Sequence, residues 1–169
     1  IAMVFQNYAL YPHMTVYENM AFSLKLKKVP KQEIDKKVRE AAEILDITAL
    51  LDRKPKALSG GQRQRMAIAR AVVKKPEIYL FDDSFSALDV KTDKTLRMRL
   101  RESMGDSTML IVAQRVGSIL DADRILVMED GQIVGRGKHR ELLHTCPLYR
   151  EIAELQLGEE EVKHELECV

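Results

Sequence analysis

The sequence is poor in cysteine and has no long apolar run. Its 169 residues contain 2 cysteines, Cys146 and Cys168, which cannot build a disulfide framework and fit a reducing cytosol. No group of cysteines and histidines has the spacing of a metal site. The longest apolar runs, such as Met109 to Ala113, are far shorter than the roughly 20 residues that cross a bilayer. We therefore expect neither a disulfide-stabilised protein nor a membrane-spanning one.

An excess of charge of one sign is also missing. The chain has 27 Lys plus Arg against 26 Asp plus Glu, a formal net charge of +1. Such a balance gives no bulk attraction to nucleic acid or anionic lipid, so any bound anion must meet a local site. With 46% hydrophobic and 31% charged residues, the composition is that of a folded domain and excludes disorder and collagen. No nucleic-acid partner is expected.

The chain opens directly in a segment typical of a strand. Ile1 to Phe5 is apolar throughout, with no initiating Met and no polar residues before it, so we expect a fragment whose upstream part is missing. Gln6 to His13 contains Pro12 and lacks helical periodicity, which indicates a loop. Residues 1–13 are therefore predicted to be the end of a core strand and the loop that follows it.

Residues 14–75 are predicted to form a helical block. Thr15 can cap one helix, and Pro30 lies close to the start of a second, where proline is tolerated. Within Glu33 to Asp46 the apolar residues follow the helical period of 3.6 and would form one buried stripe; they are Ile34, Val38, Ala41, Ala42 and Leu45.

From Pro76 to residue 157 the pattern changes to short apolar runs. Ile78 to Phe81 and Met109 to Ala113 are separated by a helical stretch near Lys91 to Ser103. Strand, helix and strand in that order predict a parallel sheet that is buried on both faces. This part of the chain is therefore assigned to the α/β class.

The last third adds a hairpin and closing helices. Asp130-Gly131 is expected to turn the chain between Ile125 to Met128 and Gln132 to Val134. Two closing helices are expected, over Lys138 to Leu143 and Leu148 to Leu155. The charged tail, residues 158–169, is expected to be either frayed or a solvent-facing helix.

Two segments carry chemistry. The first is Ser59-Gly60-Gly61-Gln62 at the head of an arginine-rich helix. Paired glycines let the backbone approach an anion, and the amides of a helix's first turn carry the positive end of its dipole, so the segment is typical of phosphate binding. A serine-capped helix after a flexible turn is the structural alternative.

The second segment is a strand that ends in two carboxylates, Asp82 and Asp83. At the carboxyl end of a parallel strand, one carboxylate can hold Mg²⁺ through water while the next polarises an attacking water. The structural alternative is an aspartate that caps the next turn. A second acidic turn follows in Ser86 to Asp89. Its pattern fits a functional role and an N-cap for the next helix equally well.

Taken in chain order, these segments resemble the nucleotide-binding domain of ATP-binding cassette (ABC) transporters over about residues 1 to 157. The resemblance implies that Leu58 to Gln62 is the signature motif, and that Asp82 is the Walker B carboxylate. It implies that Asp83 stands at the position of the catalytic base, and that Ser86 to Asp89 is the loop that touches the opposing subunit.

The resemblance also implies roles for individual residues. Gln6 would sense Mg²⁺ and the γ-phosphate, which makes it both a metal and a catalytic candidate, while Gln114 falls where the family has a switch histidine. Nucleotide binding would involve the signature and the acidic turn: Ser59, Gly60, Gly61, Gln62 and Asp89.

A fold and a set of partners follow from the same resemblance. The fold would be a partial P-loop NTPase (RecA-like) parallel sheet with an inserted α-helical subdomain. ATP and Mg²⁺ are the implied cofactors. The implied partners are a second nucleotide-binding domain, in a homo- or heterodimer, and transmembrane transporter subunits or fused spans. The implied location is cytoplasmic, peripheral on the inner face of the cell membrane.

The chain departs from the family's pattern in one missing motif and at two single positions. None of the 8 glycines belongs to a Gly-x-x-x-x-Gly-Lys-Ser/Thr loop, so the phosphate-cradling Walker A motif is absent and the chain alone should not hold ATP tightly. Asp83 replaces glutamate, which retracts the carboxylate by roughly 1.5 Å. Gln114 replaces histidine and cannot carry its charge. The last two changes resemble the degenerate-site subunit of heterodimeric exporters.

The two halves resemble different branches of the family. Residues 1 to about 62, with Phe5 to Val16 and Leu51 to Pro55, are similar to the ATPases of sugar importers. Residues from about 60 to 157, with Phe81 to Asp89 and Ile111 to Arg115, are similar to multidrug-type exporters. A recombinant or misassembled gene fragment is one explanation of this division.

Three functional hypotheses remain open. The first is an ABC-type ATPase subunit, which couples ATP binding and hydrolysis at a dimer interface to substrate transport across a membrane. The second is a noncatalytic module that completes a partner's ATP site through its signature loop. The third is a chimeric fragment without function.

Several aromatic and imidazole side chains have no assigned role. Three tyrosines could either line a groove for a membrane subunit or belong partly to the core: Tyr8, Tyr11 and Tyr17. Four histidines match no ligand spacing and are expected at the surface: His13, His139, His144 and His164.

Overall fold

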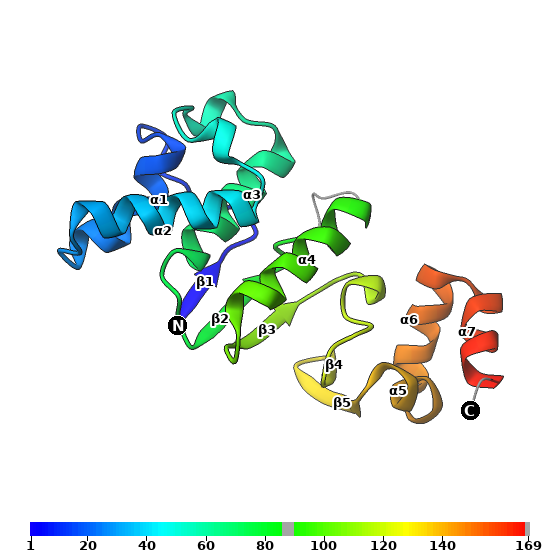
Figure 1. Cartoon of the computed structure of the whole chain (residues 1–169). Coiled ribbons are helices and arrows are strands. Elements are labelled where there is room, and N and C mark those ends of the chain that lie inside the picture. Colours follow the sequence, from blue (N-terminus) through cyan, green and yellow to red (C-terminus); the bar gives the residue numbers. More distant parts are fainter. Residues whose placement is uncertain (86–89, 168–169) are drawn as a thin grey trace. The chain divides into compact units, whose positions relative to one another are not determined.

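The computed structural model describes residues 1–85 and 90–167, which form two compact units, Ile1–Val112 and Ala113–Val169. Unit 1 is built on a sheet of three parallel strands, β1 (Ala2–Val4), β2 (Ile78–Asp82) and β3 (Thr108–Val112), in the order β1-β2-β3 (Figure 1). Val4 lies opposite Phe81, and Phe81 opposite Ile111. The predicted α/β fold with a parallel sheet is confirmed.

Outside residues 86–89, unit 1 has four α-helices: α1 (Val16–Leu26), α2 (Lys31–Ile44), α3 (Gly60–Val72) and α4 (Val90–Met104). Short 3₁₀ turns follow α2 at Thr48–Leu50 and Pro55–Ala57. Thr15 caps α1 as predicted: its side chain accepts from Glu18 N at 3.1 Å, and the Glu18 carboxylate accepts from Thr15 N at 2.8 Å. Pro30 precedes the first turn of α2, whose stripe of Ile34, Val38, Ala41 and Ala42 is buried.

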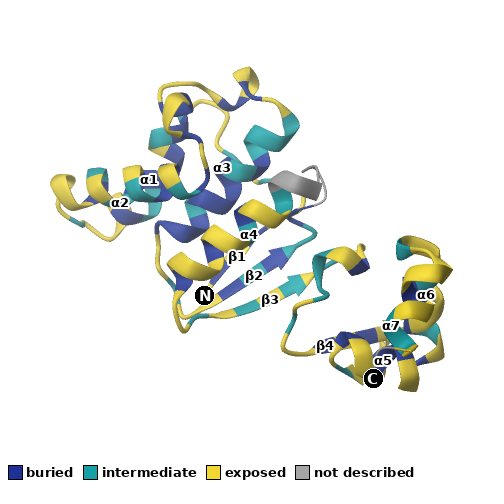
Figure 2. Cartoon of the chain, turned by 45° about the vertical axis from the view of Figure 1, so that its right-hand side comes forward, coloured by how far each residue is buried: buried dark blue, intermediate teal, exposed yellow. Residues whose placement is uncertain are grey.

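The core of unit 1 lies on one face of this sheet. Tyr79 and Phe81 point into it, with ring centroids 6.0 Å apart and planes within 3°. They pack in one cluster with apolar side chains of α3 and α4, among them Met66, Ile68 and Leu100. Most of α3 is coloured as buried in Figure 2.

The other face of the sheet is open, so the prediction of a sheet buried on both faces is wrong for unit 1. The alternate residues of β3, Leu110 and Val112, are 50% and 52% exposed, and Met3 of β1 is 40% exposed. Parallel sheets are normally covered on both faces by their crossover helices. In unit 1 the helices between the strands pack against the face of Tyr79 and Phe81.

Unit 2 begins with a 3₁₀ turn (Val116–Ser118) and an antiparallel hairpin of β4 (Ile125–Glu129) and β5 (Gln132–Gly137). Asp130 and Gly131 form the predicted turn with φ of 48° and 77°, the left-handed backbone that a two-residue hairpin loop requires. Helices α5 (His139–Thr145), α6 (Pro147–Leu157) and α7 (Glu159–Glu167) follow. The charged tail was expected to be frayed or helical, and its residues Glu159–Glu167 form the helix α7.

His139 corrects a prediction, because it is 6% exposed instead of lying at the surface. Its Nδ1 is 2.8 Å from the hydroxyl of Tyr149 on α6, and its Nε2 is 3.0 Å from a carboxylate oxygen of Glu165 on α7. Three helices therefore meet at one imidazole. The other three histidines are exposed as expected.

Candidate nucleotide site

Two predicted catalytic residues meet at the carboxyl edge of the sheet. Gln6 follows β1, and Asp83 follows the neighbouring parallel strand β2. The amide nitrogen of Gln6 donates to Oδ2 of Asp83 at 3.4 Å. Because ligands of open α/β sheets bind at this edge, the contact lies where a substrate is expected. Asp82, the predicted metal ligand, is the last residue of β2 and pairs in register with Val112 of β3.

The backbone turns sharply at Asp83. Its φ is 44°, in the left-handed region that residues with a side chain rarely adopt, and its N–H donates to Val112 O at 2.9 Å. The next residue, Ser84, is 1% exposed and donates through its hydroxyl to Val4 O at 2.9 Å. Ser84 thereby ties the end of β2 to the end of β1. Sequence reasoning missed it, because a serine after two aspartates gives no signal of a partner 80 positions away.

The diglycine segment forms the partly exposed amino end of α3. Ser59 is the N-cap: its Oγ accepts from Gln62 N at 3.3 Å, and Gln62 Oε1 accepts from Ser59 N at 2.9 Å. Gln62 therefore holds the cap in this structure. No residue in the described ranges accepts a backbone hydrogen bond from the N–H groups of Gly60 or Gly61. Two amides at the positive end of a helix dipole are thus available to an anion.

The remaining predicted residues are not brought to this edge within unit 1. Gln114 belongs to unit 2, where it is exposed and its carbonyl accepts from Gln156 Nε2 at 2.9 Å. The other end of the Gln156 amide accepts from Val116 N at 2.8 Å, so Gln156 fixes the backbone around Gln114. Asp89, with the rest of the acidic turn Ser86 to Asp89, lies outside the described residues.

The donor set at the sheet edge suits Mg²⁺. This ion takes oxygen ligands and keeps several waters, so it is usually held by one or two protein groups plus substrate phosphates. Asp82 and Asp83 offer carboxylates, and Gln6 donates to Asp83 through its nitrogen, which leaves the amide oxygen as a further ligand. Among the described residues, no group of three His, Cys, Asp or Glu side chains could hold a metal by itself.

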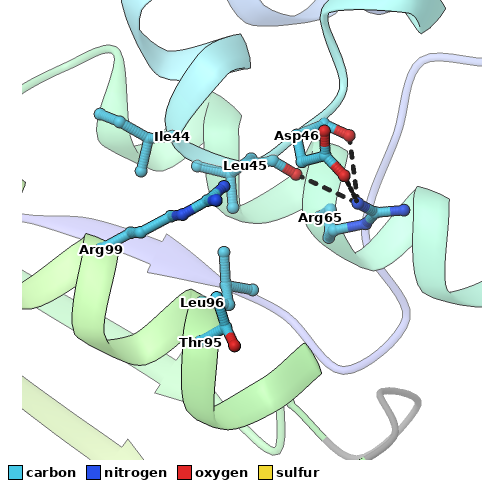
Figure 3. Close-up of a pocket in the computed structure, with 7 residues that line it drawn as sticks. All are labelled: Ile44, Leu45, Asp46, Arg65, Thr95, Leu96 and Arg99. Atoms are coloured by element: carbon cyan, nitrogen blue, oxygen red, sulfur yellow. Dashed lines mark hydrogen bonds and ion pairs between the residues drawn. The ribbon is translucent and has the colours of Figure 1, made fainter. Parts of the chain in front are cut away.

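A separate cleft of about 220 Å³ lies between the end of α2, α3 and α4 (Figure 3). Arg65 spans one side and donates through Nη1 to Leu45 O, to Asp46 O and to the Asp46 carboxylate, at 3.4, 3.1 and 3.2 Å. The lining residues are Ile44, Leu45, Asp46, Arg65, Thr95, Leu96 and Arg99, none of which is a predicted site residue. The cleft thus lies between packed helices and shares no residue with the predicted site at the carboxyl edge of the sheet.

No helix in the described part of the chain is both long enough and apolar enough to cross a membrane. The parallel sheet with carboxylates at its carboxyl edge defines an α/β protein whose ligand site is expected at that edge. Residues 1–86 match the family model of the ABC transporter. The chain belongs to this family.

Import ATP-binding proteins are similar to the chain in sequence. It is 54% identical over 134 residues to the trehalose/maltose import ATP-binding protein MalK of Thermococcus litoralis, covering 78% of this chain and 36% of that protein. It is 52% identical over 136 residues to the oligosaccharides import ATP-binding protein MsmX of Bacillus subtilis, covering 79% and 37%. The chain thus spans little more than a third of the length of these relatives.

Among solved structures, a bacterial Atm1-family ABC exporter with ATP bound superposes with a TM-score of 0.79. The two share 31% sequence identity, and the match covers 94% of this chain and 28% of the exporter. The predicted resemblance to an ABC nucleotide-binding domain is therefore confirmed by sequence and by fold.

Proposed function

We propose that this chain is part of the ATP-binding subunit of an ABC transporter and contributes to ATP hydrolysis at a dimer interface. The observation that carries the proposal is the Gln6–Asp83 contact, which joins two family-matched positions at the ligand-binding edge of the sheet. Hydrolysis in the complete assembly would move the membrane subunits.

At its own edge, the chain would face one nucleotide. Gln6 and Asp82 would hold Mg²⁺, which when bound neutralises the charge of the phosphates. Asp83 would accept a hydrogen bond from the attacking water and polarise it. Gln6 orients the Asp83 carboxylate through its amide nitrogen. The short Asp83 side chain predicts slow hydrolysis on this side.

At the amino end of α3, the chain would face a second nucleotide, held by the partner domain. The N–H groups of Gly60 and Gly61 would donate to its γ-phosphate, and the Ser59 cap keeps the helix end in place for that contact. Gln62 would act through the cap, since its side chain accepts from Ser59 N. Asp89 would contact the opposing domain.

The sequence matches favour an importer for carbohydrates, because relatives named for trehalose, maltose and oligosaccharide import are 54% and 52% identical. The partners would be a second nucleotide-binding domain and membrane-spanning subunits, which select the transported substrate. The chain would work on the cytoplasmic face of the membrane.

A second function is favoured by a specific observation. Among the described residues, the amides of Gly60 and Gly61 have no backbone acceptor, so they could contact a partner's ATP even though this chain has no Walker A loop. The chain would then be a noncatalytic module that completes the partner's site. The predicted domain boundaries at residues 13, 75 and 157 fit either function.

Phosphate release by the chain assembled with a nucleotide-holding partner tests both functions. Ser59→Arg places a bulky cation on the γ-phosphate contact and should reduce turnover at the partner's site by at least about 10²-fold. Ser103→Arg, at an exposed position of α4, is the matched control and should leave turnover unchanged. Unchanged turnover in Ser59→Arg would overturn both functions, and hydrolysis by this chain alone would exclude the module.

A further inference from the structure

The loop behind Gln6 has an unfavourable backbone. Tyr8 and Ala9 are consecutive residues with φ of 65° and 44°, although neither is glycine. Residues with a Cβ rarely adopt this left-handed region, and two in succession are not stable by themselves. The local hydrogen bonds of the two residues, Tyr8 N to Phe5 O at 3.0 Å and Ala9 N to Asn7 O at 2.8 Å, close only short turns. A contact from outside the loop is therefore needed to hold it.

Arg70 on α3 supplies this contact. Its Nη1 donates to Ala9 O at 2.6 Å and its Nη2 donates to Tyr8 O at 3.3 Å, so one guanidinium holds both left-handed residues. Its guanidinium carbon also lies 5.9 Å from the centre of the Tyr11 ring, within reach of a cation–π attraction. Planar guanidinium groups suit such paired contacts because their donors are fixed in one plane.

The contact is mutual, because Arg70 itself depends on the loop. Burial lowers the pKa of Arg70, although an arginine remains protonated in proteins. No carboxylate within residues 1–85 and 90–167 pairs with it. A partly buried cation without a counter-ion is stabilised by carbonyl dipoles around it, and Tyr8 and Ala9 provide them. Its charge also lowers the pKa of Lys74, one turn further along the chain, after the larger effect of burial.

The far half of the loop is fixed independently by Asn19. This residue of α1 is fully buried, accepts from Tyr11 N at 2.9 Å, and donates to Tyr11 O at 3.1 Å and Thr15 O at 2.9 Å. The loop is therefore anchored to α1 beyond Tyr11 and to α3 at Tyr8 and Ala9. The part closest to Gln6 depends on Arg70.

We infer that Arg70 is a positioning residue for Gln6, and that it couples the Ser59–Gln62 segment to the metal side of the same chain. Both features lie on one helix: Ser59 caps the first turn of α3, and Arg70 extends from its last turn. A rigid helix transmits a displacement of its amino end to its carboxyl end. The inference rests on the proposed function, because it assigns to Gln6 and Ser59 their roles at two nucleotides.

Hydrogen exchange of the 169-residue chain tests the contact without any assumption about function. Arg70→Met keeps a long side chain with an apolar stem but removes both guanidinium donors to the loop. It should accelerate exchange of the peptide covering residues 5–14 by about tenfold or more. Peptides from α3 should not change. The control is Arg39→Met on α2, whose side chain is 58% exposed and which should leave residues 5–14 unaffected. Unchanged exchange of this loop in Arg70→Met would overturn the inference.

A second variant separates the specific effect from general loss of folding. Arg70→Lys keeps the charge but cannot hold both carbonyls in one plane, and should accelerate the loop alone. Ala9→Gly in the Arg70→Met chain should restore part of the protection, since glycine adopts the left-handed backbone freely. Wild-type exchange in Arg70→Lys, or no recovery with Ala9→Gly, would contradict the role assigned to Arg70.

Turnover by the assembled transporter then tests the coupling. Arg70→Met should lower kcat about tenfold, leave KM for ATP within about twofold, and raise severalfold the Mg²⁺ concentration for half-maximal turnover. A merely structural role would reduce the active fraction without moving the Mg²⁺ midpoint, and that result would overturn the coupling. Failure of the proposed function would appear differently, as no turnover in the wild-type assembly, with the exchange results unchanged.

Discussion

The amide nitrogen of Gln6 donates to the carboxylate of Asp83 at 3.4 Å, although 77 positions separate the two residues. The contact exists because each residue follows one of two adjacent parallel strands, β1 and β2, whose carboxyl ends share an edge. It holds the Asp83 carboxylate toward the end of β1 and leaves the Gln6 oxygen for a cation. The proposed hydrolytic chemistry of this chain depends on that pair.

Lengthening the carboxylate at this position should increase activity. Asp83→Glu adds one methylene, which moves the carboxylate by roughly 1.5 Å toward an attacking water, and ATP turnover at this edge in the assembled transporter should rise at least about tenfold. Asp83→Asn removes the charge and should give no increase. Phosphate release measures both variants, and a glutamate variant no faster than wild type would contradict the assignment of Asp83 as the base.

The cap at Ser59 should contribute measurably to stability. Ser59→Ala removes the acceptor for Gln62 N and should lower the free energy of unfolding by about 1 kcal/mol. Ser23→Ala is the matched control, because the buried Ser23 hydroxyl has no hydrogen-bond partner among the described residues. Its removal should be neutral within about 0.5 kcal/mol or stabilising. Urea unfolding followed by circular dichroism compares them, and equal effects would contradict the cap's contribution.

Gly135 should not tolerate a side chain. A Cβ built there would lie 2.8 Å from Cys146 Sγ and 3.1 Å from Leu142 Cδ2, so Gly135→Ala forces α5 away from β5 and should cost about 1–3 kcal/mol. Gly117→Ala is the control, because a Cβ there meets nothing within 4 Å. Thermal unfolding should show a lower Tm for the first variant only. Equal Tm values would show that the hairpin and α5 are less closely packed.

The stability of unit 2 should fall at alkaline pH. Burial, and then the charge of Glu165, raise the pKa of Tyr149 from 10.0 to about 12. A raised pKa means that the folded state favours the neutral hydroxyl. The stability that this hydroxyl contributes is therefore complete below pH 10 and is lost as the pH rises toward 12. The loss is on the order of 2 kcal/mol.

Tyr149→Phe isolates this effect from the titration of other groups. The variant loses the contact with His139 Nδ1 and should be less stable than wild type near neutral pH. The difference between the two proteins in free energy of unfolding should narrow from pH 10 to 12, as the wild-type hydroxyl ionises. A constant difference across this range in urea titrations would contradict the raised pKa.

Features that depend on neighbours in the chain could be predicted from the sequence. The caps at Thr15 and Ser59 follow from a polar residue before a helical pattern, and the Asp130-Gly131 turn follows from backbone preference. The proximity of Gln6 and Asp83 could also be predicted, because the carboxyl ends of neighbouring parallel strands lie at the same edge of the sheet.

Features that depend on distant partners could not be predicted. The burial of His139 requires Tyr149 and Glu165 from two other helices, and an isolated histidine gives no sign of them. The exposure of Leu110 and Val112 depends on which face the helices cover, whereas their apolar character alone suggested burial. Arg70 was not singled out, since its partners are backbone carbonyls of a loop more than 60 positions away.

The central claim is that the Ser59–Gln62 segment contacts the γ-phosphate of an ATP held by another domain. An ATP analogue with a photoreactive group on its γ-phosphate tests this directly, through the tryptic peptide of residues 57–63. We predict that illumination labels this peptide when the nucleotide-holding partner is present, and that the chain alone remains unlabelled. Labelling that avoids residues 57–63 in the assembly, or that occurs equally without the partner, would contradict the account.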